Sequence, residues 1–260
     1  MTNDYDVEPV ETLIEPAQSS NDSGYTISSS RMFGRRRRLD GYHYNPSSEC
    51  VLAALKKSGR TLDSLGSVCE RVFGVKRFKH FYGNEGIPYL DSEDIFKLNP
   101  EILKLIPEVS KKDAEAYFVQ KGWVLMACSG QIYGLNGGVV LADTWHENKS
   151  VSNHVVRIEP RKNAIRSGFL QMAMAHPLYG RPLILRLAFG TEVPEIDPLE
   201  LVDFPLPRID TKQENAIADR IEEASSLRMT ADKTENDAVG FVEAYLEPSL
   251  GITSTATKIA

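Results

Sequence analysis

The last long segment of the chain, residues 211–247, constrains the fold more than any other part of the sequence. It follows Pro205 and Pro207, and it contains no proline and a single glycine, Gly240. Helix-forming residues fill the segment, and apolar residues recur in it at helical spacing. A helix of this length spans about 55 Å, which exceeds the width of a domain of this size. We therefore expect a helix that projects from the body as a spacer or docks a partner.

The apolar stripe of this helix has small residues in the middle and larger ones towards the ends. Its members are Ile217, Ile221, Ala224, Leu227, Ala231, Ala238, Val242 and Tyr245. Small side chains let two helices approach closely, but they bury little apolar area. By itself the stripe would form only a weak helix–helix contact, which we call a seam, and we expect a partner helix to cover it.

Composition indicates an ordinary globular protein. The 260 residues are 42% hydrophobic, and no stretch is long and apolar enough for a membrane span. The acidic N-terminus lacks an apolar segment, which predicts no signal peptide. Cys50, Cys69 and Cys128 lie far apart without a Cys-x-x-Cys pair. This favours reduced thiols in a cytoplasmic protein and argues against a zinc ribbon.

The net charge of −6 conceals an uneven distribution. Residues 1–30 hold six acidic and no basic residues, residues 31–210 hold 25 basic and 21 acidic, and residues 211–260 hold five basic and nine acidic. The middle of the chain is therefore mildly basic between two acidic ends. Such a body attracts nucleic acid, although ordinary variation in surface charge is an equal alternative.

The pattern along the chain divides it into four parts. We expect residues 1–30 to form a disordered acidic tail and residues 31–210 a mixed α/β domain. Residues 211–247 form the long helix, and residues 248–260 a flexible tail. The run Arg35–Arg38 begins the domain. It is either an arm that contacts phosphates or a solvated run of charge.

Within the domain, turn residues separate short apolar segments. Asn45 and Pro46 can start a helix that Gly59 ends, and residues 164–176 suit a short buried helix stopped by Pro177. Segments typical of strands are residues 68–75, 87–90, 123–128, 139–142, 154–158 and 183–187. We therefore predict a mixed α/β domain followed by a long coiled-coil-type helix.

Catalytic motifs are scarce in the sequence. The glycine-rich GLNGG at residues 134–138 lacks the Gly-Lys-Ser/Thr of a phosphate loop, and a hairpin turn explains it better. There is no G-x-S-x-G elbow, and none of the five histidines forms an H-E-x-x-H pair. No catalytic tetrapeptide of an S-adenosylmethionine-dependent methyltransferase occurs either.

One fragment leaves an enzymatic alternative open. Glu147 and Lys149 form an E-x-K tripeptide with Asp143 upstream. In metal-dependent nucleases, carboxylates in such a pattern hold the metal and a lysine supports the attacking water. The tripeptide is common, however, and here it falls in an expected loop.

An ordered series of phrases resembles one protein family. The phrases are RLDGYHYNP (38–46), GIPYL (86–90), DIFKLNP (94–100), GWVLMACSG (122–130), SNHVVRI (152–158), HPLYG (176–180), VPEID (193–197), FPLP (204–207) and IADRIEEA (217–224). Across residues 38–247, this order resembles the specificity (S) subunit of type I restriction–modification enzymes, in its target recognition domain and following helix.

The resemblance implies a DNA-reading protein that has no catalytic residues or cofactor of its own. Its recognition domain would read one half of a split target in double-stranded DNA. Its helix would pack antiparallel against a second helix and contact the modification subunits. Those partners would bind S-adenosylmethionine and methylate adenine, and a restriction subunit can join them.

The chain departs from that family in carrying one recognition domain and one helix instead of two of each. It is therefore expected to form an antiparallel homodimer or to pair with a second specificity chain. A symmetric dimer would read a two-fold symmetric split site.

Three segments offer side chains suited to reading DNA in such a domain. Basic and aromatic residues alternate between residues 71 and 82, glycines frame a loop at residues 129–134, and polar residues occupy 152–154. The predicted contacts are Lys76, Arg77, Lys79, His80, Tyr82, Ser129, Gln131, Tyr133, Asn153 and His154, with Lys149, Arg157, Lys162 and Arg166 as phosphate contacts. The alternatives are a nuclease using Asp143, Glu147 and Lys149, and a helix-mediated assembly protein that does not bind DNA.

Overall fold

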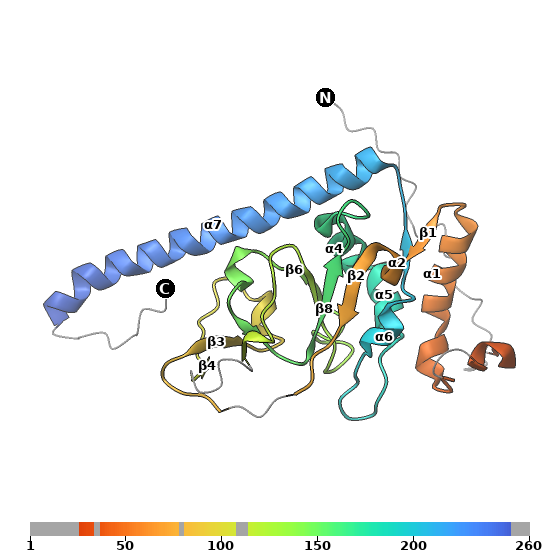
Figure 1. The fold of residues 1–260 in the computed structure, drawn as a ribbon, viewed down its shortest axis with the longest axis horizontal. Coiled ribbons are helices and arrows are strands. Elements are labelled where there is room, and N and C mark those ends of the chain that lie inside the picture. The colour runs from red at the N-terminus through yellow and green to blue at the C-terminus, as the bar shows by residue number, and fades with distance from the viewer. Residues whose placement is uncertain (1–25, 34–36, 78–80, 108–113, 251–260) are drawn as a thin grey trace, which may run out of the picture.

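The computed structural model describes residues 26–33, 37–77, 81–107 and 114–250. It is a mixed α/β body followed by one long C-terminal helix, α7 (Thr211–Leu250), as the sequence predicts. Figure 1 shows α7 running along one side of the body and beyond it. Most of the predicted tail 1–30 lies outside the described residues.

The described elements are short apart from α1 and α7. The helices of the body are α1 (Pro46–Lys57), α2 (Leu65–Val68), α4 (Ser167–Ala175), α5 (Gly180–Leu185) and α6 (Pro198–Leu201), with 3-10 turns η2 (Ser29–Phe33), η3 (Gly41–Tyr44), η4 (Asp94–Phe96) and η6 (Thr144–His146). The strands are β1 (Leu62–Ser64), β2 (Cys69–Phe73), β3 (Ile87–Leu90), β4 (Leu105–Ile106), β5 (Val124–Ala127), β6 (Val139–Leu141), β7 (Ser150–Val151), β8 (Val155–Pro160) and β9 (Pro205–Pro207). None of the helices in the described part of the chain has both the length and the apolar character needed to cross a lipid bilayer.

A four-stranded antiparallel sheet in the order β2-β8-β5-β6 forms the centre of the body. Strands β2 and β5 run in one direction, and β8 and β6 run in the other. The ends of β2 and β5 therefore meet the starts of β8 and β6 at one edge of the sheet. Two smaller sheets, β4-β3-β7 and β1-β9, lie beside it.

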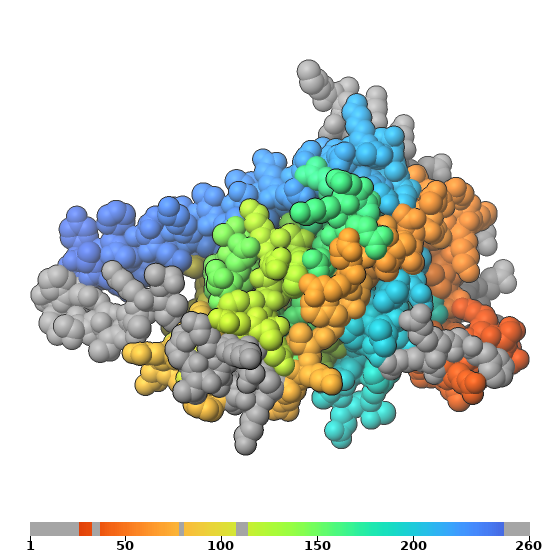
Figure 2. Space-filling model, viewed as in Figure 1, coloured from red at the N-terminus to blue at the C-terminus, as the bar shows by residue number. Residues whose placement is uncertain are grey.

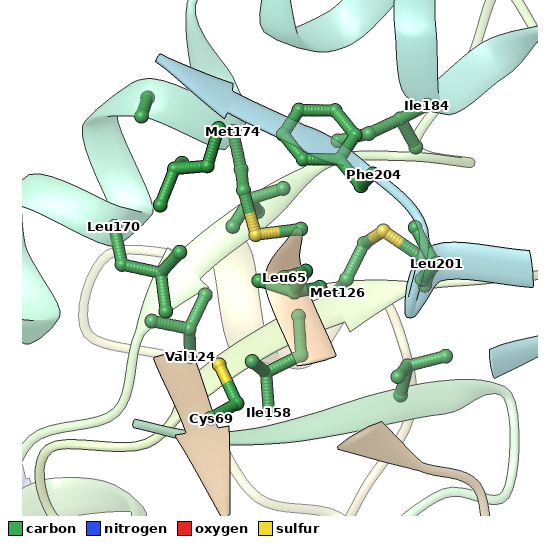
Figure 3. Close-up of a cluster of buried hydrophobic side chains, with 14 of the residues drawn as sticks. Leu65, Cys69, Val124, Met126, Ile158, Leu170, Met174, Ile184, Leu201 and Phe204 are labelled. Carbon is green, nitrogen blue, oxygen red and sulfur yellow. The ribbon is translucent and has the colours of Figure 1, made fainter. Parts of the chain in front are cut away.

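Both faces of the central sheet are buried, which explains why β5 is apolar at every position. Met126 and Ile158 point from the sheet into the main core, where they meet Leu170 and Met174 of α4 (Figure 3). On the other face, Leu125 packs in a second cluster with Trp123, Val155 and Leu90. The alternation of side chains along each strand distributes its residues between the two clusters.

The structure confirms most of the predicted elements. Helix α1 begins after Asn45, whose side chain accepts from the amide of Ser48 at 2.9 Å, and Gly59 follows its end at a φ of +69°. The predicted strands at 68–75, 87–90, 123–128, 139–142 and 154–158 correspond to β2, β3, β5, β6 and β8. The glycine-rich segment 134–138 lies in the connection of the β5–β6 hairpin.

The predicted strand at 183–187 is wrong, because this segment begins within helix α5. A short apolar run is ambiguous between the two states, and Pro182 fits the first turn of a helix. Gly180 permits the helix to start against α4, since a Cβ there would lie 2.2 Å from the carbonyl oxygen of Ala173. The sequence also gave no signal for the two- and three-residue strands β1, β4, β7 and β9.

Helix α7 has 40 residues and is about 60 Å long. Its first half packs on α4 and the main core through Ile217, the fully buried Ala218 and Ile221. Asn99 still contacts Glu235 and Asn236 in the second half, and the C-terminal end of the helix extends past the coloured surface of the body (Figure 2).

This arrangement corrects the predicted stripe. Ile217 and Ile221 contact the chain's own body, and Ala224 lines a cavity of about 540 Å³ between α7 and the body. These three residues are therefore not available to a partner helix in this structure. Leu227, Val242 and Tyr245 are exposed, at 62%, 55% and 79% of their surface.

Candidate nucleic-acid interface

The strand directions bring three predicted DNA-reading segments together at one edge of the central sheet. Residues 74–77 leave β2, residues 128–138 connect β5 to β6, and residues 152–154 precede β8. We call these segments, together with residues 189–198, the loop edge. In Figure 1, β2 ends on the side of the body opposite α7, and the loop between α5 and α6 extends beside it.

The sequence pattern did not predict that residues 189–198 would belong to this edge. It is hydrogen-bonded to the β5–β6 connection by the amide of Ile196 to the carbonyl of Cys128 at 2.8 Å and by that of Gly130 to Pro194 at 3.1 Å. The fully buried Asn136 strengthens the junction, because its Nδ2 donates to the carbonyls of Gly130 at 2.8 Å and Pro194 at 2.9 Å. Asn136 followed by Gly137 is a common turn signal, but that pattern does not show which segment the turn contacts.

The predicted residues of the β5–β6 connection lie at the surface of this edge. Gln131 is exposed, and its Nε2 donates to the carbonyl of Glu192 at 3.0 Å. Ser129 Oγ donates to Glu195 Oε1 at 3.2 Å. Tyr133 is 86% exposed, which is unusual for a large aromatic side chain. Aromatic and amide groups in such positions are suited to base edges and sugars.

Asn153 and His154 lie beside a hollow of about 320 Å³ in the loop edge. Their side chains make no hydrogen bond to any of the described residues, so both are free to accept or donate to a ligand. Cys128 also lines the hollow, and burial raises the pKa of its thiol to about 11. This thiol is therefore neutral at pH 7.

The basic segment after β2 is only partly described. Lys76 and Arg77 are exposed on the loop edge, whereas Lys79 and His80 lie outside the described residues. Tyr82 lies near the second sheet instead, where its ring is 5.8 Å from that of Tyr89. Burial raises the pKa of the Tyr82 hydroxyl.

Arg157 does not fit its predicted role as a phosphate contact. It is only 1% exposed, and its guanidinium donates to the backbone carbonyls of Ser152 at 3.0 Å, of Tyr117 at 3.4 Å, and of Val151 and Val155. Burial lowers its pKa to about 10, so the group stays positive at pH 7. Arg157 therefore holds the turn that carries Asn153 and His154, and it does not contact solvent.

Two other predicted phosphate contacts, Lys149 and Arg166, lie away from the loop edge and contact other parts of the chain. Arg166 pairs with Asp219 and Glu222 of α7, each at 2.6 Å, and these hydrogen bonds raise its pKa. Lys149 is half-buried and donates to the carbonyl of Trp145, over whose ring its Nζ lies at 4.6 Å. Lys149 and Arg166 are therefore engaged within the chain, and their prediction as free phosphate contacts is wrong.

Lys162 is exposed, but it follows β8 and lies at the opposite edge of the sheet.

Of the arginine run, Arg35 and Arg36 lie outside the described residues, and Arg38 is anchored in the body. Its guanidinium pairs with Asp40 at 2.5 Å and Glu200 at 3.2 Å, and it donates to the carbonyl of Ala188 at 2.8 Å. Arg38 therefore fastens the start of the domain to the segment after α5.

In the structure, Asp143 and Glu147 of the nuclease alternative are each engaged by other residues of the chain. Asp143 Oδ1 lies 2.8 Å from His146 Nδ1, and its Oδ2 accepts from Ser225 of α7 at 3.2 Å. Burial alone would raise the pKa of Asp143, but these hydrogen bonds outweigh it and hold the pKa below its usual value. Glu147 instead accepts from the amide of Lys121 at 3.3 Å. Within the described ranges, no three His, Cys, Asp or Glu side chains are placed to hold one metal ion.

Comparison with known proteins gives structural similarities only. No protein-family model matches the sequence. No curated protein matches it at a significant level. The chain is similar in structure to the type I restriction–modification S subunit from M. genitalium, with 17% identity and a TM-score of 0.44 over 69% of this chain and 41% of that one.

Two further solved structures are similar. The HsdS subunit from Thermoanaerobacter tengcongensis is 14% identical, with a TM-score of 0.42 over 72% of this chain and 45% of that one. A structure on the assembly of the type I restriction–modification system is 12% identical, with a TM-score of 0.38 over 83% of this chain and 53% of that one. The chain thus spans about half or less of these structures. The structures named here nevertheless come from the family that the sequence resembles.

Proposed function

We propose that the chain is a sequence-specificity subunit that binds double-stranded DNA for a type I restriction–modification complex. The observation that carries this proposal is the convergence of residues 74–77, 128–138 and 152–154 at one edge of the central sheet. The edge presents basic, amide and aromatic side chains on several loops, which is what reading a groove requires. In this proposal the loop edge reads one half of a split target.

The proposal assigns the chemistry to partner subunits. Modification subunits dock on the chain, bind S-adenosylmethionine and methylate adenine, and a restriction subunit joins the complex. Asp143, which the nuclease alternative needs, is engaged by α7 and by its own turn in this chain.

The interface is tested by substituting one basic and one amide residue of the loop edge. We expect Arg77→Ala and Gln131→Ala each to weaken binding of the selected target by about 10- to 100-fold, because each removes donors suited to a base edge. Binding to random duplexes should fall much less. The measurement is titration of both duplexes by fluorescence anisotropy at fixed salt, after the target is selected from a randomised library.

Lys162→Ala is the matched control, since it removes one exposed positive charge at the opposite edge of the sheet. It should leave both affinities nearly unchanged. Equal losses on target and random DNA would contradict the assignment of Arg77 and Gln131 as base readers. Absence of any salt-dependent DNA binding, even with modification subunits present, would favour the assembly protein without DNA binding.

We further propose that the exposed half of α7 pairs antiparallel with a second helix, from another copy of the chain or from another specificity chain. Exposed residues there follow the alternating spacing of four and three that a coiled-coil seam requires. They are Leu227, Ala231, Thr234, Ala238, Phe241 and Tyr245. At about 100° per residue, Leu227 lies on the side of the helix opposite the buried Ala218, so the body does not cover this seam.

A single charge in the seam should weaken the pairing. We expect Phe241→Glu to raise the dissociation constant of the dimer by about 10-fold or more, because a carboxylate would be buried between two helices. Phe241 is 67% exposed in the chain described here, so the substitution should not disturb the body. Sedimentation equilibrium measures the dissociation constant.

Val239→Glu is the control, because Val239 is 49% exposed and faces another side of the same turn. It should leave the dissociation constant close to that of the unsubstituted chain. A monomer in solution, both with and without modification subunits, would contradict the pairing itself.

A further inference from the structure

The hollow in the loop edge combines apolar walls with several hydrogen-bonding groups. Val75 and Ile196 line it together with Asn153, His154 and Glu195. Its volume of about 320 Å³ admits part of a base edge together with water, and it is too small for a whole nucleotide pair. With Cys128, the groups around it come from four separate segments of the chain, so the fold itself assembles them.

Glu195 is held in place more firmly than an exposed loop residue usually is. Its amide donates to the carbonyl of Phe189 at 2.8 Å, and its own carbonyl accepts from the amide of Phe189 at 2.9 Å. The next residue, Ile196, is buried with 2% of its surface exposed. The Glu195 side chain is nevertheless exposed, and Ser129 contacts only its Oε1. The carboxylate is therefore positioned and still has acceptor sites free.

The charges of the loop edge are separated. Lys76 and Arg77 are exposed where the chain leaves β2, whereas Glu192 and Glu195 belong to the 189–198 segment. A carboxylate against DNA is repelled by the phosphates, so its presence is tolerated only where it meets a hydrogen-bond donor. In the major groove, the base donors are the amino groups adenine N6 and cytosine N4.

From this geometry we propose that Glu195 is a specificity residue that accepts a hydrogen bond from the exocyclic amino group of one base, adenine or cytosine, in the major groove. The proposal rests on the proposed function, because it concerns the same loop edge. Lys76 and Arg77, exposed at the same loop edge where the chain leaves β2, supply positive charge beside that contact. Asn153 and His154 complete the surroundings of the base from the turn before β8. Guanine and thymine, which present carbonyl oxygens at that point, are rejected by the carboxylate.

The test compares the 260-residue chain with its Glu195→Met variant in selections from a randomised duplex library. Methionine keeps a similar length and removes the acceptor, and because the side chain is exposed the substitution leaves the fold intact. We expect one position of the selected motif to prefer adenine or cytosine in the unsubstituted chain. In the variant, that preference should fall by about 10- to 100-fold, with the other positions unchanged.

Glu192→Met is the matched control, since it removes the same charge from the same segment at an exposed residue that does not line the hollow. It should raise affinity for all duplexes alike and leave the motif unchanged. An identical motif from Glu195→Met, or loss of the same position in Glu192→Met, overturns the assignment of Glu195 and leaves the proposed function standing. Failure of the unsubstituted chain to select any motif overturns both.

Discussion

Replacing Arg157 with methionine is expected to lower the free energy of unfolding by about 3 kcal/mol, because several buried carbonyls lose their donor at once. The guanidinium is 1% exposed and serves the carbonyls of Val151, Ser152, Val155 and Tyr117. Each carbonyl left without a donor costs about 1 kcal/mol or more. Removal of a buried charge offsets part of that cost, since methionine fills similar space without a desolvation penalty. Urea denaturation followed by circular dichroism measures the difference.

Arg161→Met provides the control for this prediction. Arg161 lies just after the same strand. Its side chain is 47% exposed, pairs with Glu70 at 3.3 Å, and donates to the carbonyls of Ser67 at 3.0 Å and Cys69 at 3.2 Å. Because this side chain is at the surface, water can replace the lost donor and the exposed ion pair contributes about 0–1 kcal/mol, so the loss should be smaller than for Arg157. Equal stabilities of the two variants would show that Arg157 does not hold the turn before β8.

The second large effect is expected where α4 meets α7. A Cβ at Gly168 would lie 2.6 Å from the carbonyl oxygen and 3.0 Å from the Cα of Ala218, both of them backbone atoms. Neither atom can move without shifting α7. We therefore expect Gly168→Ala to lower the free energy of unfolding by about 2 kcal/mol, although alanine favours a helix more than glycine does. Thermal and urea denaturation measure this change.

Gly240→Ala is the same substitution in a position without neighbours. Outside its own helical turns, no atom of the described residues lies within 4 Å of a Cβ built at Gly240, which belongs to the exposed half of α7. Only helix propensity then acts, and we expect stability to rise by about 0.5–1 kcal/mol. The two glycines should therefore respond with opposite signs. A stabilising Gly168→Ala would mean that α4 and α7 do not pack as closely as described.

The local pattern of the sequence predicted most of the strands and the long helix. The strand β3 was predicted with its observed bounds, because Gly86 precedes its short apolar run and the charged Asp91 follows it. The antiparallel order of the central sheet then places the predicted segments 74–77, 128–138 and 152–154 at one edge. That order depends on pairings between distant residues, such as Val72 with Ile158, which a local pattern does not encode.

The parts that were not predicted also depend on contacts between distant residues. The position of Glu195 depends on Ser129 and Cys128, which lie far from it in the chain. The sequence predicts Arg157 as a phosphate contact, but it stands among apolar residues in a strand that is buried on both faces. The periodicity of α7 showed an apolar stripe, but not that the body would cover its first half. Whether one face of a helix is buried depends on the surface that packs against it, which local periodicity does not encode.

The contacts along the first half of α7 also affect how its far half becomes ordered. Starting a helix fixes several residues for one hydrogen bond, whereas extending an existing helix gains one bond for each residue added. Arg166, Asp143 and Asn99 contact α7 at Asp219, at Ser225 and at Glu235 and Asn236. These contacts supply the nucleus, so the turns beyond Asn236 form by propagation alone. In the pairing proposed above, the exposed seam would thus already be helical before a second helix binds, and the binding energy would not have to offset the entropy cost of nucleation.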